Sequence, residues 1–501
     1  EKRTHAWRPM DSLRRRALVL NRLEEAGSRG RRAPWFRQNT EYTEILCEMK
    51  KSYEIDMCDG PLLSKILLFS VPLMMSGILQ LLFNAADIIV VGRFAGSSAL
   101  AAVGSTSSLI NLLINVFVGL SVGVNVLVAK YYGGQREKDM SETVHTAVLT
   151  SLLSGLFLVI LGGIAARPLL HLMGTPDDVL DQAVLYMRIY FLGMPVLMVY
   201  NFGAAILRAI GDTRRPLYFL FMAGVVNVAL NLFFVIGLGM GVDGVGWATV
   251  ISEHVSALLV LKSLMEAPGA LKLNLKELRI HPKKLKRIVK IGLPAGMQGA
   301  IFSISNVLIQ SSVNSFGSIA MAGNTASANI EGFVYTAMNA VYQTNLSFTS
   351  QNLGGRKYSR INRIMYICLA VVTVVGITLG ITAVLAGDLL LGIYSSDAHV
   401  LRYGMLRLEI ICGTYFLCGI MDCMVGSLRG LGYSVIPMFV SLTGACGFRV
   451  LWVFTVFAAY RSLDVLYLSY PVSWAITAIA HMITFRKIRR KIPRQDAVPL
   501  A

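Results

Sequence analysis

The stretch that decides the fold is LRAIGDTRRP at residues 207–216, which returns as LRGLGYSVIP at residues 428–437. A second landmark recurs at the same distance of about 221 residues, because Gly133-Gly134 reappears as Gly354-Gly355. Matches at one offset indicate an internal duplication. We therefore interpret the chain as two homologous halves.

Composition shows what kind of chain carries this duplication. Of its 501 residues, 54% are hydrophobic and only 15% are charged, whereas a soluble domain carries about 25% charged residues. The chain lacks the polar residues needed to cover a water-facing surface, which excludes a soluble multidomain protein. A formal net charge of +18 would favour nucleic-acid binding in a soluble chain, but here most residues must face lipid or one another. We predict an all-α polytopic membrane protein without a nucleic-acid partner.

Twelve apolar runs are long enough to cross a bilayer, which takes about 20 residues. Basic residues gather on alternate loops, most densely between Lys262 and Lys290, as the positive-inside rule requires of cytoplasmic segments. This pattern predicts a multi-pass protein of the cell's inner (plasma) membrane with both termini in the cytoplasm. The predicted spans are residues 62–91, 104–130, 144–166, 184–207, 216–238, 244–264, 290–314, 319–350, 363–386, 403–427, 434–459 and 465–485.

The duplication divides the chain into five parts. Residues 1–48 are basic, contain no hydrophobic region of a signal peptide and precede a plausible start at Met49. We interpret them as disordered or as non-native sequence. The predicted parts are a basic leader (1–56), an N-terminal lobe of six spans (57–264), a cytoplasmic linker (265–289), a C-terminal lobe of six spans (290–488) and a basic cytoplasmic tail (489–501).

The even number of spans in each half points to transport. Both halves enter the membrane from the same side and form a parallel repeat, as in some secondary transporters. The sequence has no G-x-x-x-x-G-K-[ST] segment for ATP and no H-E-x-x-H or G-x-S-x-G catalytic site. Its seven cysteines show no C-x-x-C spacing, so they indicate neither a metal site nor a disulfide framework. We expect a transporter that is not an enzyme, has no cofactor, and uses an ion gradient or the gradient of its substrate.

Ionisable side chains inside the spans are the candidate functional residues, because burying a charge in the bilayer costs roughly 2.5–3.5 kcal/mol. Asp87 lies among apolar residues near the outer end of the first span, where loss of water favours the protonated carboxyl group. Such a group can take up H+ or Na+ on one side and release it on the other. Further residues predicted at the transport site are Asn84, Asn201, Asn227, Asn231 and Thr249, and the candidate secondary carboxylates are Glu253, Glu331 and Asp422.

Arg449 is the one basic residue assigned to the interior of a span, whereas Arg407 is assigned to an outer helix end. An ion pair of Arg449 with Glu331 or Asp422 is the structural alternative to a functional role for those carboxylates, since intramembrane charges tend to pair.

The first span resembles the signature of the multidrug and toxic-compound extrusion (MATE) family, prokaryotic type. The resemblance is carried by Asn84-Ala85-Ala86-Asp87, Val91-Gly92 and Ala101-Ala102-Val103-Gly104, together with the glycine-rich landmarks, and covers about residues 57–488. It implies a V-shaped pair of six-helix lobes that exports organic cations, drugs and other amphipathic compounds against H+ or Na+.

The resemblance also implies roles for single residues. Asp87 matches the family's first-span carboxylate, and Asn227 and Thr249 match the amide and hydroxyl that accompany it. Asn231 departs from members with an acidic residue there, which weakens the case for a tight Na+ site because hard cations favour carboxylate oxygens. Transient Na+ binding at Asp87 stays open. Glutamates that some branches carry in the seventh span have no counterpart at residues 301–303.

Two other functions are alternatives. A lipid-linked oligosaccharide flippase or polysaccharide exporter would share the two-lobe architecture, but it would need several cationic side chains in its cavity to bind phosphates. A sensor or receptor is the other alternative, since a repeat shows ancestry rather than activity. The sequence favours a monomeric, cation-coupled antiporter whose partners are the lipid bilayer and small, cationic, amphipathic substrates.

Overall fold

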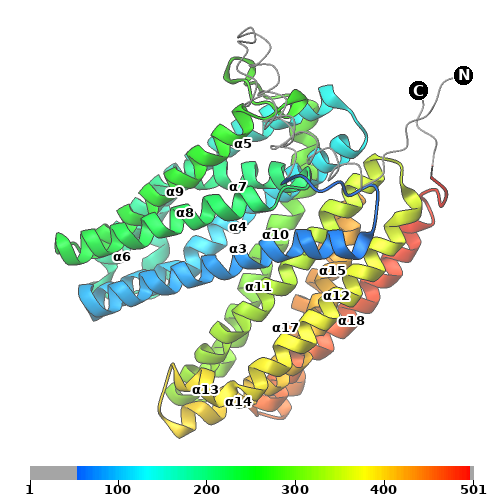
Figure 1. Ribbon diagram of the computed structural model, residues 1–501. Helices are drawn as coiled ribbons and strands as arrows, with labels where there is room; N and C mark the ends of the chain where they lie inside the picture. The colour runs from blue at the N-terminus through cyan, green and yellow to red at the C-terminus, as the bar shows by residue number, and fades with distance from the viewer. Residues whose placement is uncertain (1–52, 497–501) are drawn as a thin grey trace, which may run out of the picture. The chain divides into compact units, whose positions relative to one another are not determined.

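The computed structural model describes residues 53–496, apart from the side chains of Ser97 and Ser108. The chain divides into two units, Glu1–Ser52 and Tyr53–Ala501, and the second holds every described residue. Within those residues all regular structure is helical (Figure 1), which confirms the predicted all-α class. The predicted leader up to residue 52 and residues 497–501 of the predicted tail lie outside the described residues.

The N-terminal lobe holds the first six predicted spans. Two of its helices continue into a π-helical segment, and the fourth span is a pair of helices. The elements are α3 (Leu62–Val90) with η2 (Val91–Ala95), α4 (Ser97–Gly133), α5 (Glu137–Leu172), α6 (Asp177–Leu192), α7 (Met194–Ala209), α8 (Arg214–Asn231) with η3 (Leu232–Gly237), and α9 (Val242–Met265).

The C-terminal lobe repeats this arrangement after two short 3₁₀ turns, η4 (Gly269–Leu271) and η5 (Leu275–Glu277). Its first helix begins at Pro282, inside the predicted linker, because the first turns of that helix are charged rather than apolar. The elements are α10 (Pro282–Asn314), α11 (Ser318–Gly354), α12 (Tyr358–Leu385), α13 (Gly387–Gly392), α14 (Ala398–Thr414), α15 (Phe416–Gly430), α16 (Val435–Ser441), η6 (Leu442–Gly447), α17 (Phe448–Trp452), η7 (Val453–Phe457) and α18 (Leu463–Arg489).

Two predicted spans are each built from two helices that meet at an angle. α6 and α7 are bent by 48° around Gly193, and α14 and α15 by 44° around Tyr415. At the first bend Pro195 lies in the first turn of α7, where its missing N–H leaves no bond unmade. Gly155 of α5 packs directly on it, since a Cβ on Gly155 would lie 2.2 Å from the Pro195 Cα.

Among the described residues, nine helices are long and apolar enough to cross a membrane, and counting each bent pair as one span gives eleven. The predicted span missing from these eleven is the eighth, residues 319–350, which is α11, and its buried residues include Asn324, Glu331 and Asn345. A helix that other helices surround can carry such residues, because it contacts protein instead of lipid. All twelve predicted ranges therefore fall on helices or bent helix pairs, and the chain is a multi-pass membrane protein.

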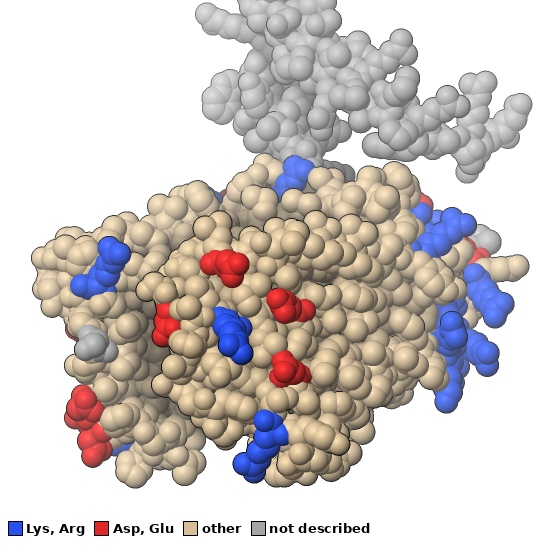
Figure 2. Space-filling view, turned by 90° about the horizontal axis from the view of Figure 1, so that it is seen from below, with Lys and Arg blue, Asp and Glu red and all other residues tan. Residues whose placement is uncertain are grey.

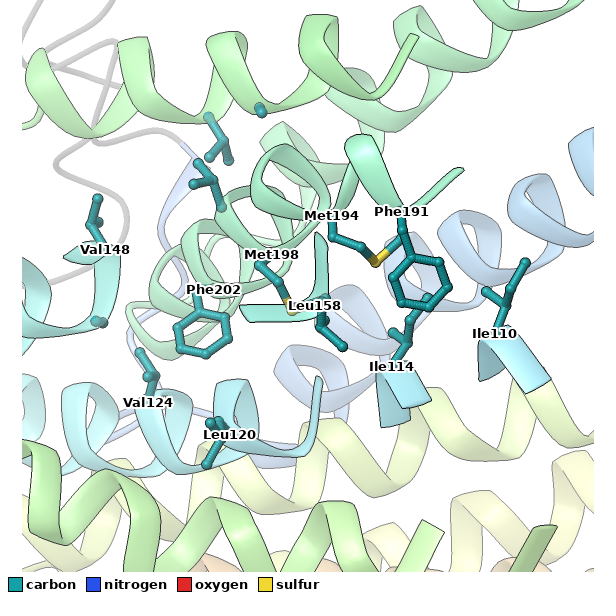
Figure 3. Close-up of a cluster of buried hydrophobic side chains, with 14 of the residues drawn as sticks. Ile110, Ile114, Leu120, Val124, Val148, Leu158, Phe191, Met194, Met198 and Phe202 are labelled. Atoms are coloured by element: carbon teal, nitrogen blue, oxygen red, sulfur yellow. The ribbon is translucent and has the colours of Figure 1, made fainter. Parts of the chain in front are cut away.

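Each lobe has its own apolar core. In the N-terminal lobe, Phe191, Met194, Met198 and Phe202 form one stripe that continues from α6 into α7 across the bend (Figure 3). Spacings of three and four residues place these side chains on one helix face. The stripe packs toward α4 and α5, so the bend is stabilised from both sides by apolar contacts.

Large apolar side chains also lie on the outside of the described unit. Ile164 is 74% exposed and Leu385 is 83% exposed. Figure 2 shows a face that is mostly uncharged, with a few red and blue side chains scattered over it and a group of blue side chains at one edge. Such a surface would be unstable in water, whereas it is the expected lipid-facing surface of a membrane protein.

The lobes contact each other closely through glycines on α4 and α10. Gly119-x-x-x-Gly123 faces Gly292-x-x-x-Gly296, and a Cβ on Gly119 would lie 2.2 Å from the Gly296 nitrogen. Small residues four positions apart let two helix backbones touch inside a membrane. This junction is absent from the predictions above, although the G-x-x-x-G spacing is a recognised signal for it.

The repeated Gly-Gly landmark forms a second contact between the lobes, between the ends of α4 and α11. A Cβ on Gly133 would lie 2.1 Å from the carbonyl oxygen of Gln351, and one on Gly354 would lie 1.9 Å from that of Lys130. The equivalent ends of α4 and α11 therefore contact each other. Only glycine fits here in either half, which explains why both copies of the duplicated element carry it.

The segment Tyr53–Gly60 contacts both lobes before α3 begins. The backbone N–H of Ile55 donates to the carbonyl of Gly211 in the N-terminal lobe at 3.2 Å. The side chain of Asn352 in the C-terminal lobe donates to the carbonyl of Met57 at 2.9 Å. The last four residues of the predicted leader thus belong to the packed unit. The predicted boundary is too late because backbone hydrogen bonds, rather than an apolar pattern, hold this segment.

Candidate functional site

The site in the N-terminal lobe is built around Asp87. Asp87 lies one turn before the end of α3, and Asn231 is the last residue of α8. The side-chain amide of Asn231 donates a hydrogen bond to the Asp87 carboxylate. Both helices continue directly into π-helical segments, η2 and η3, and such segments are frequent at functional sites. The fold thus brings together two predicted site residues that are far apart in the sequence.

Two further predicted residues extend this contact into a chain of hydrogen bonds. Asn231 also donates to the side-chain carbonyl of Asn227 at 3.2 Å, one helical turn earlier. Asn227 donates in turn to the Thr249 hydroxyl oxygen on α9 at 3.5 Å, and that hydroxyl donates to the carbonyl of Val245 at 3.0 Å. The chain ties α3, α8 and α9 together at the carboxylate.

Asp87 has a second carboxylate near it and no cation. Among the described residues, no lysine or arginine pairs with Asp87. Glu253 on α9 is close enough to interact electrostatically with Asp87. It lies beside the α6–α7 bend, since a Cβ on Gly193 would be 2.9 Å from Glu253 Oε2. The site therefore carries negative charge that these protein groups do not neutralise.

This arrangement suits a mobile cation. The side-chain oxygen of Asn231 is buried and has no hydrogen-bond partner among the described atoms. It lies on the residue that binds Asp87, and hard cations are held by carboxylate, amide and hydroxyl oxygens of this kind. Within residues 53–496, no group of three or more His, Cys, Asp or Glu could hold a metal ion. The group supports reversible uptake of H+ or a weakly held cation better than a tight metal site.

Two predicted site residues do not join this chain of hydrogen bonds. Asn84 has an exposed side chain one turn before Asp87. Asn201 on α7 donates to the carbonyl of Leu197 in its own helix at 2.9 Å. Asn84 lies three residues before Asp87 on the same side of α3, yet no described hydrogen bond joins the two, and spacing within one helix cannot reveal which residues a neighbouring helix covers.

The C-terminal lobe holds Glu331 in an ion pair, and the partner is Arg407. Arg407 Nε and Nη2 donate to the two carboxylate oxygens, each at 2.7 Å, and Nη1 donates to the Asn324 side chain at 2.6 Å. The prediction that Arg449 pairs with Glu331 is wrong. Arg407 is only 7% exposed and lies inside α14, which begins at Ala398, five residues before the predicted span. The error arose because the helix start was placed by hydropathy, which assigned Arg407 to an outer helix end.

Arg449 is buried without a carboxylate. Its Nε donates to the Ser473 hydroxyl at 2.9 Å, and its guanidinium lies 4.1 Å from the ring centroid of Tyr470. Asp422 lies instead near Tyr335 and Arg429. Within the described part of the chain neither Asp422 nor Arg449 forms a salt bridge, so the predicted pairing of these two is also wrong.

Two lobes of membrane-crossing helices, duplicated in parallel and carrying buried polar sites, define a polytopic membrane transporter. The chain belongs to the MatE family, whose model matches residues 72–233 and 294–455. One match falls in each lobe, which confirms the resemblance drawn from the first span and the glycine-rich landmarks.

Several relatives extend over most of the chain. It is 27% identical over 421 residues to the probable multidrug resistance protein YoeA of Bacillus subtilis (strain 168), covering 82% of this chain and 91% of that protein. It is 22% identical over 383 residues to the probable multidrug resistance protein NorM of Thermotoga maritima, with coverages of 75% and 82%. It is 24% identical over 363 residues to the FAD transporter of Shewanella oneidensis, with coverages of 70% and 79%.

Solved structures share the fold. A multidrug resistance MATE family transporter in an outward-facing conformation superposes with a TM-score of 0.82 at 20% identity, covering 88% of this chain and 98% of that one. A MOP superfamily transporter from Pyrococcus furiosus, described as having a binding pocket of reversed polarity, also gives 0.82 at 20% identity, with coverages of 87% and 98%. These matches confirm the two-lobe architecture.

Proposed function

We propose that this chain is an H+- or Na+-coupled antiporter that exports organic cations, drugs and other amphipathic small molecules by alternating access. The relatives described as multidrug resistance proteins support the class of substrate. The observation that carries the coupling is the Asp87 carboxylate, which the Asn231 amide holds and no described cation neutralises.

The proposed cycle follows from this charge. A carboxylate without a cationic partner in an apolar environment is unstable unless it binds a proton or a cation. Ion uptake neutralises Asp87, weakens its bond with Asn231 and lets α3 and α8 repack. A cationic substrate competes for the same negative charge, so its binding favours release of the ion. Competition at one charge is sufficient for exchange.

We further propose that the protein works as a monomer in the inner membrane with both termini in the cytoplasm, as the positive-inside pattern indicates. The proposal needs no enzymatic step and no cofactor. A flippase is less well supported, because phosphate recognition requires several free cationic groups, and the cationic group that lines the described cavity of the C-terminal lobe, Arg407, is paired with Glu331.

The test is efflux of a fluorescent organic cation from everted vesicles under imposed pH and Na+ gradients. We expect Asp87→Asn to remove gradient-driven transport almost completely, because the amide cannot exchange a proton or hold a cation. Asn201→Ala is the matched control, since Asn201 bonds within its own helix, and it should retain transport.

Gradient-driven efflux that survives Asp87→Asn would refute the coupling role of this residue. Efflux that depends on neither gradient would refute the antiporter. The ion whose gradient drives the wild-type protein identifies the coupling ion.

A further inference from the structure

The C-terminal lobe contains a cavity of about 230 Å³ between α10, α11, α14 and α18. Its lining includes Gln310, Asn324, Glu331, Arg407, Tyr415 and Tyr470. Every lining residue belongs to the C-terminal lobe, so the cavity is separate from the Asp87 site. A cavity of roughly 150 Å³ accommodates benzene, so this one has room for one aromatic ring with a polar substituent.

Arg407 presents unused donors at this cavity. A guanidinium carries five N–H groups. Two of them bind Glu331, and a third binds Asn324. Among the described residues, one N–H on each terminal nitrogen has no hydrogen-bond partner. A carboxylate suits these donors, because its oxygens accept charge-assisted hydrogen bonds from a guanidinium.

A second arginine makes the surroundings of the cavity positive. Arg449 is 2% exposed, and its Nη2 is buried without a hydrogen-bond partner in the described structure. Its guanidinium lies against Tyr470, a ring that lines the cavity. The ionisable neighbours of Arg449 are tyrosines and cysteines rather than carboxylates. Arg407, Arg449 and Glu331 together leave one uncompensated positive charge.

Aromatic side chains form the wall beside these charges. Tyr415 stacks on Trp474 with ring centroids 5.3 Å apart, and Tyr470 meets the same indole edge-on at 5.6 Å. Tyr415 also lies at the break between α14 and α15. Packed rings of this kind give the cavity an apolar, aromatic wall.

We propose that this cavity binds the carboxylate-bearing aromatic group of a transported compound. The carboxylate accepts hydrogen bonds from the free N–H groups of Arg407, the nearby Arg449 adds positive charge, and the ring packs against the Tyr415 and Tyr470 side chains. Export of the bound compound rests on the proposed function, whereas binding does not. The substrate range then includes zwitterions whose cationic end is attracted to Asp87.

Calorimetric titration of the purified full chain in detergent tests the binding. We expect benzoate to bind about tenfold more tightly than benzamide, which has the same shape without the charge. Arg449→Gln should weaken benzoate binding about tenfold and leave benzamide binding unchanged. Arg429→Gln is the control, because Arg429 is a buried arginine of the same lobe that bonds Tyr342 and Gln298 and does not line the cavity.

A gain of affinity provides a test that misfolding cannot imitate. Glu331→Gln removes the negative charge beside Arg407, so benzoate should bind several-fold more tightly than to the wild type. Equal affinities for benzoate and benzamide would overturn the proposal. Benzoate affinity unchanged in both Arg449→Gln and Glu331→Gln would overturn it as well.

Transport of a matched pair of dyes separates this proposal from the proposed function. A rhodamine methyl ester is a cation, and its free acid carries a carboxylate on a pendant ring. Arg449→Gln should lower efflux of the free acid and spare the ester, and equal loss of both would count against the subsite. If Asp87→Asn leaves coupling intact while benzoate selectivity holds, the antiporter fails and the subsite stands. If Asp87→Asn abolishes coupling and benzoate binds no more tightly than benzamide, the antiporter stands and the subsite fails.

Discussion

In the N-terminal lobe the partly buried Asp87 carboxylate is held by an amide and no described cation, whereas in the C-terminal lobe the buried Glu331 carboxylate is held by two nitrogens of Arg407. The lobes repeat the same order of six spans, so equivalent positions in the two can be compared. About 221 residues beyond Asp87 the chain has Leu308 and Ile309. The C-terminal copy of the carboxylate position is therefore apolar.

After a duplication, the two copies can come to carry different charges in equivalent regions. About 221 residues beyond Asn227 lie Phe448 and Arg449, so the C-terminal lobe has a cation near the place where the N-terminal lobe has an amide. One lobe has acquired free negative charge and the other free positive charge. Because opposite charges in one pocket would neutralise each other, keeping them in separate lobes preserves both.

The largest expected effect is a loss of stability when the ion pair of Arg407 and Glu331 is broken. Arg407→Ala leaves Glu331 buried without its partner, which should lower the free energy of unfolding by about 3–5 kcal/mol. Asp87→Ala should change it much less, since no described cation depends on Asp87. Unfolding of the purified protein in mixed detergent micelles measures both. Arg402→Ala, at an exposed position of the same helix, is the control, and an equal effect at positions 402 and 407 would show that the buried pair does not stabilise the lobe.

The next effect concerns Cys58, in the segment that contacts both lobes. Burial, together with Asp56 and Asp59, raises the pKa of the Cys58 thiol to about 11. Below that pH little thiolate is present, so in a Cys47→Ser background maleimide should label Cys58 about a hundredfold more slowly at pH 8 than it labels a free cysteine peptide. Labelling should accelerate as the pH rises toward 11.

Loosening this segment should restore the ordinary reactivity of the thiol. Asn352→Ala removes the hydrogen bond to the Met57 carbonyl and is expected to speed labelling at pH 8, whereas Asn201→Ala is not. Mass spectrometry identifies the labelled residue, and the other described cysteines are buried. If Cys58 is labelled as fast as the free peptide in the protein without Asn352→Ala, the segment is not packed against the two lobes.

The smallest expected effect sharpens the N-terminal site. Asn231→Asp places a second carboxylate beside Asp87, and hard cations favour carboxylate oxygens as ligands. The apparent affinity for Na+ in gradient-driven efflux should rise about tenfold. Asn227→Asp tests whether position matters, since Asn227 contacts Asp87 only through Asn231. An unchanged Na+ dependence in Asn231→Asp would exclude direct contact of this position with the coupling ion.

Part of the site was predictable from the sequence. A carboxylate inside an apolar run is costly wherever it lies, so Asp87 is conspicuous without a structure. Asn227 and Asn231 are four residues apart on one helix, as are Thr249 and Glu253 on the next, and the family resemblance points to Asn227 and Thr249 as well. Their contacts with Asp87 could not be derived, because three separate helices meet there. Asn84 and Asn201 have the same chemistry but do not join these hydrogen bonds.

The C-terminal lobe shows the limit more clearly. Arg407 lies near the start of an apolar run, which is also where a surface arginine at a helix end would lie, and only the packing of α14 against α11 shows that it is buried. The partner of Glu331 was therefore assigned to the wrong arginine. The interlobe contact of α4 with α10 was missed too, although its glycine spacing was visible.

The sequence by itself determined the membrane environment, the twelve candidate spans, the duplication and the carboxylate at Asp87. These follow from local properties, namely hydrophobicity over about 20 residues, repeated motifs, and the cost of burying a charge. Only the tertiary structure decided which buried charges meet a partner. Pairing depends on helix rotation and on contacts between residues far apart in the chain, and so Glu331 is neutralised by Arg407 while Asp87 keeps its negative charge available.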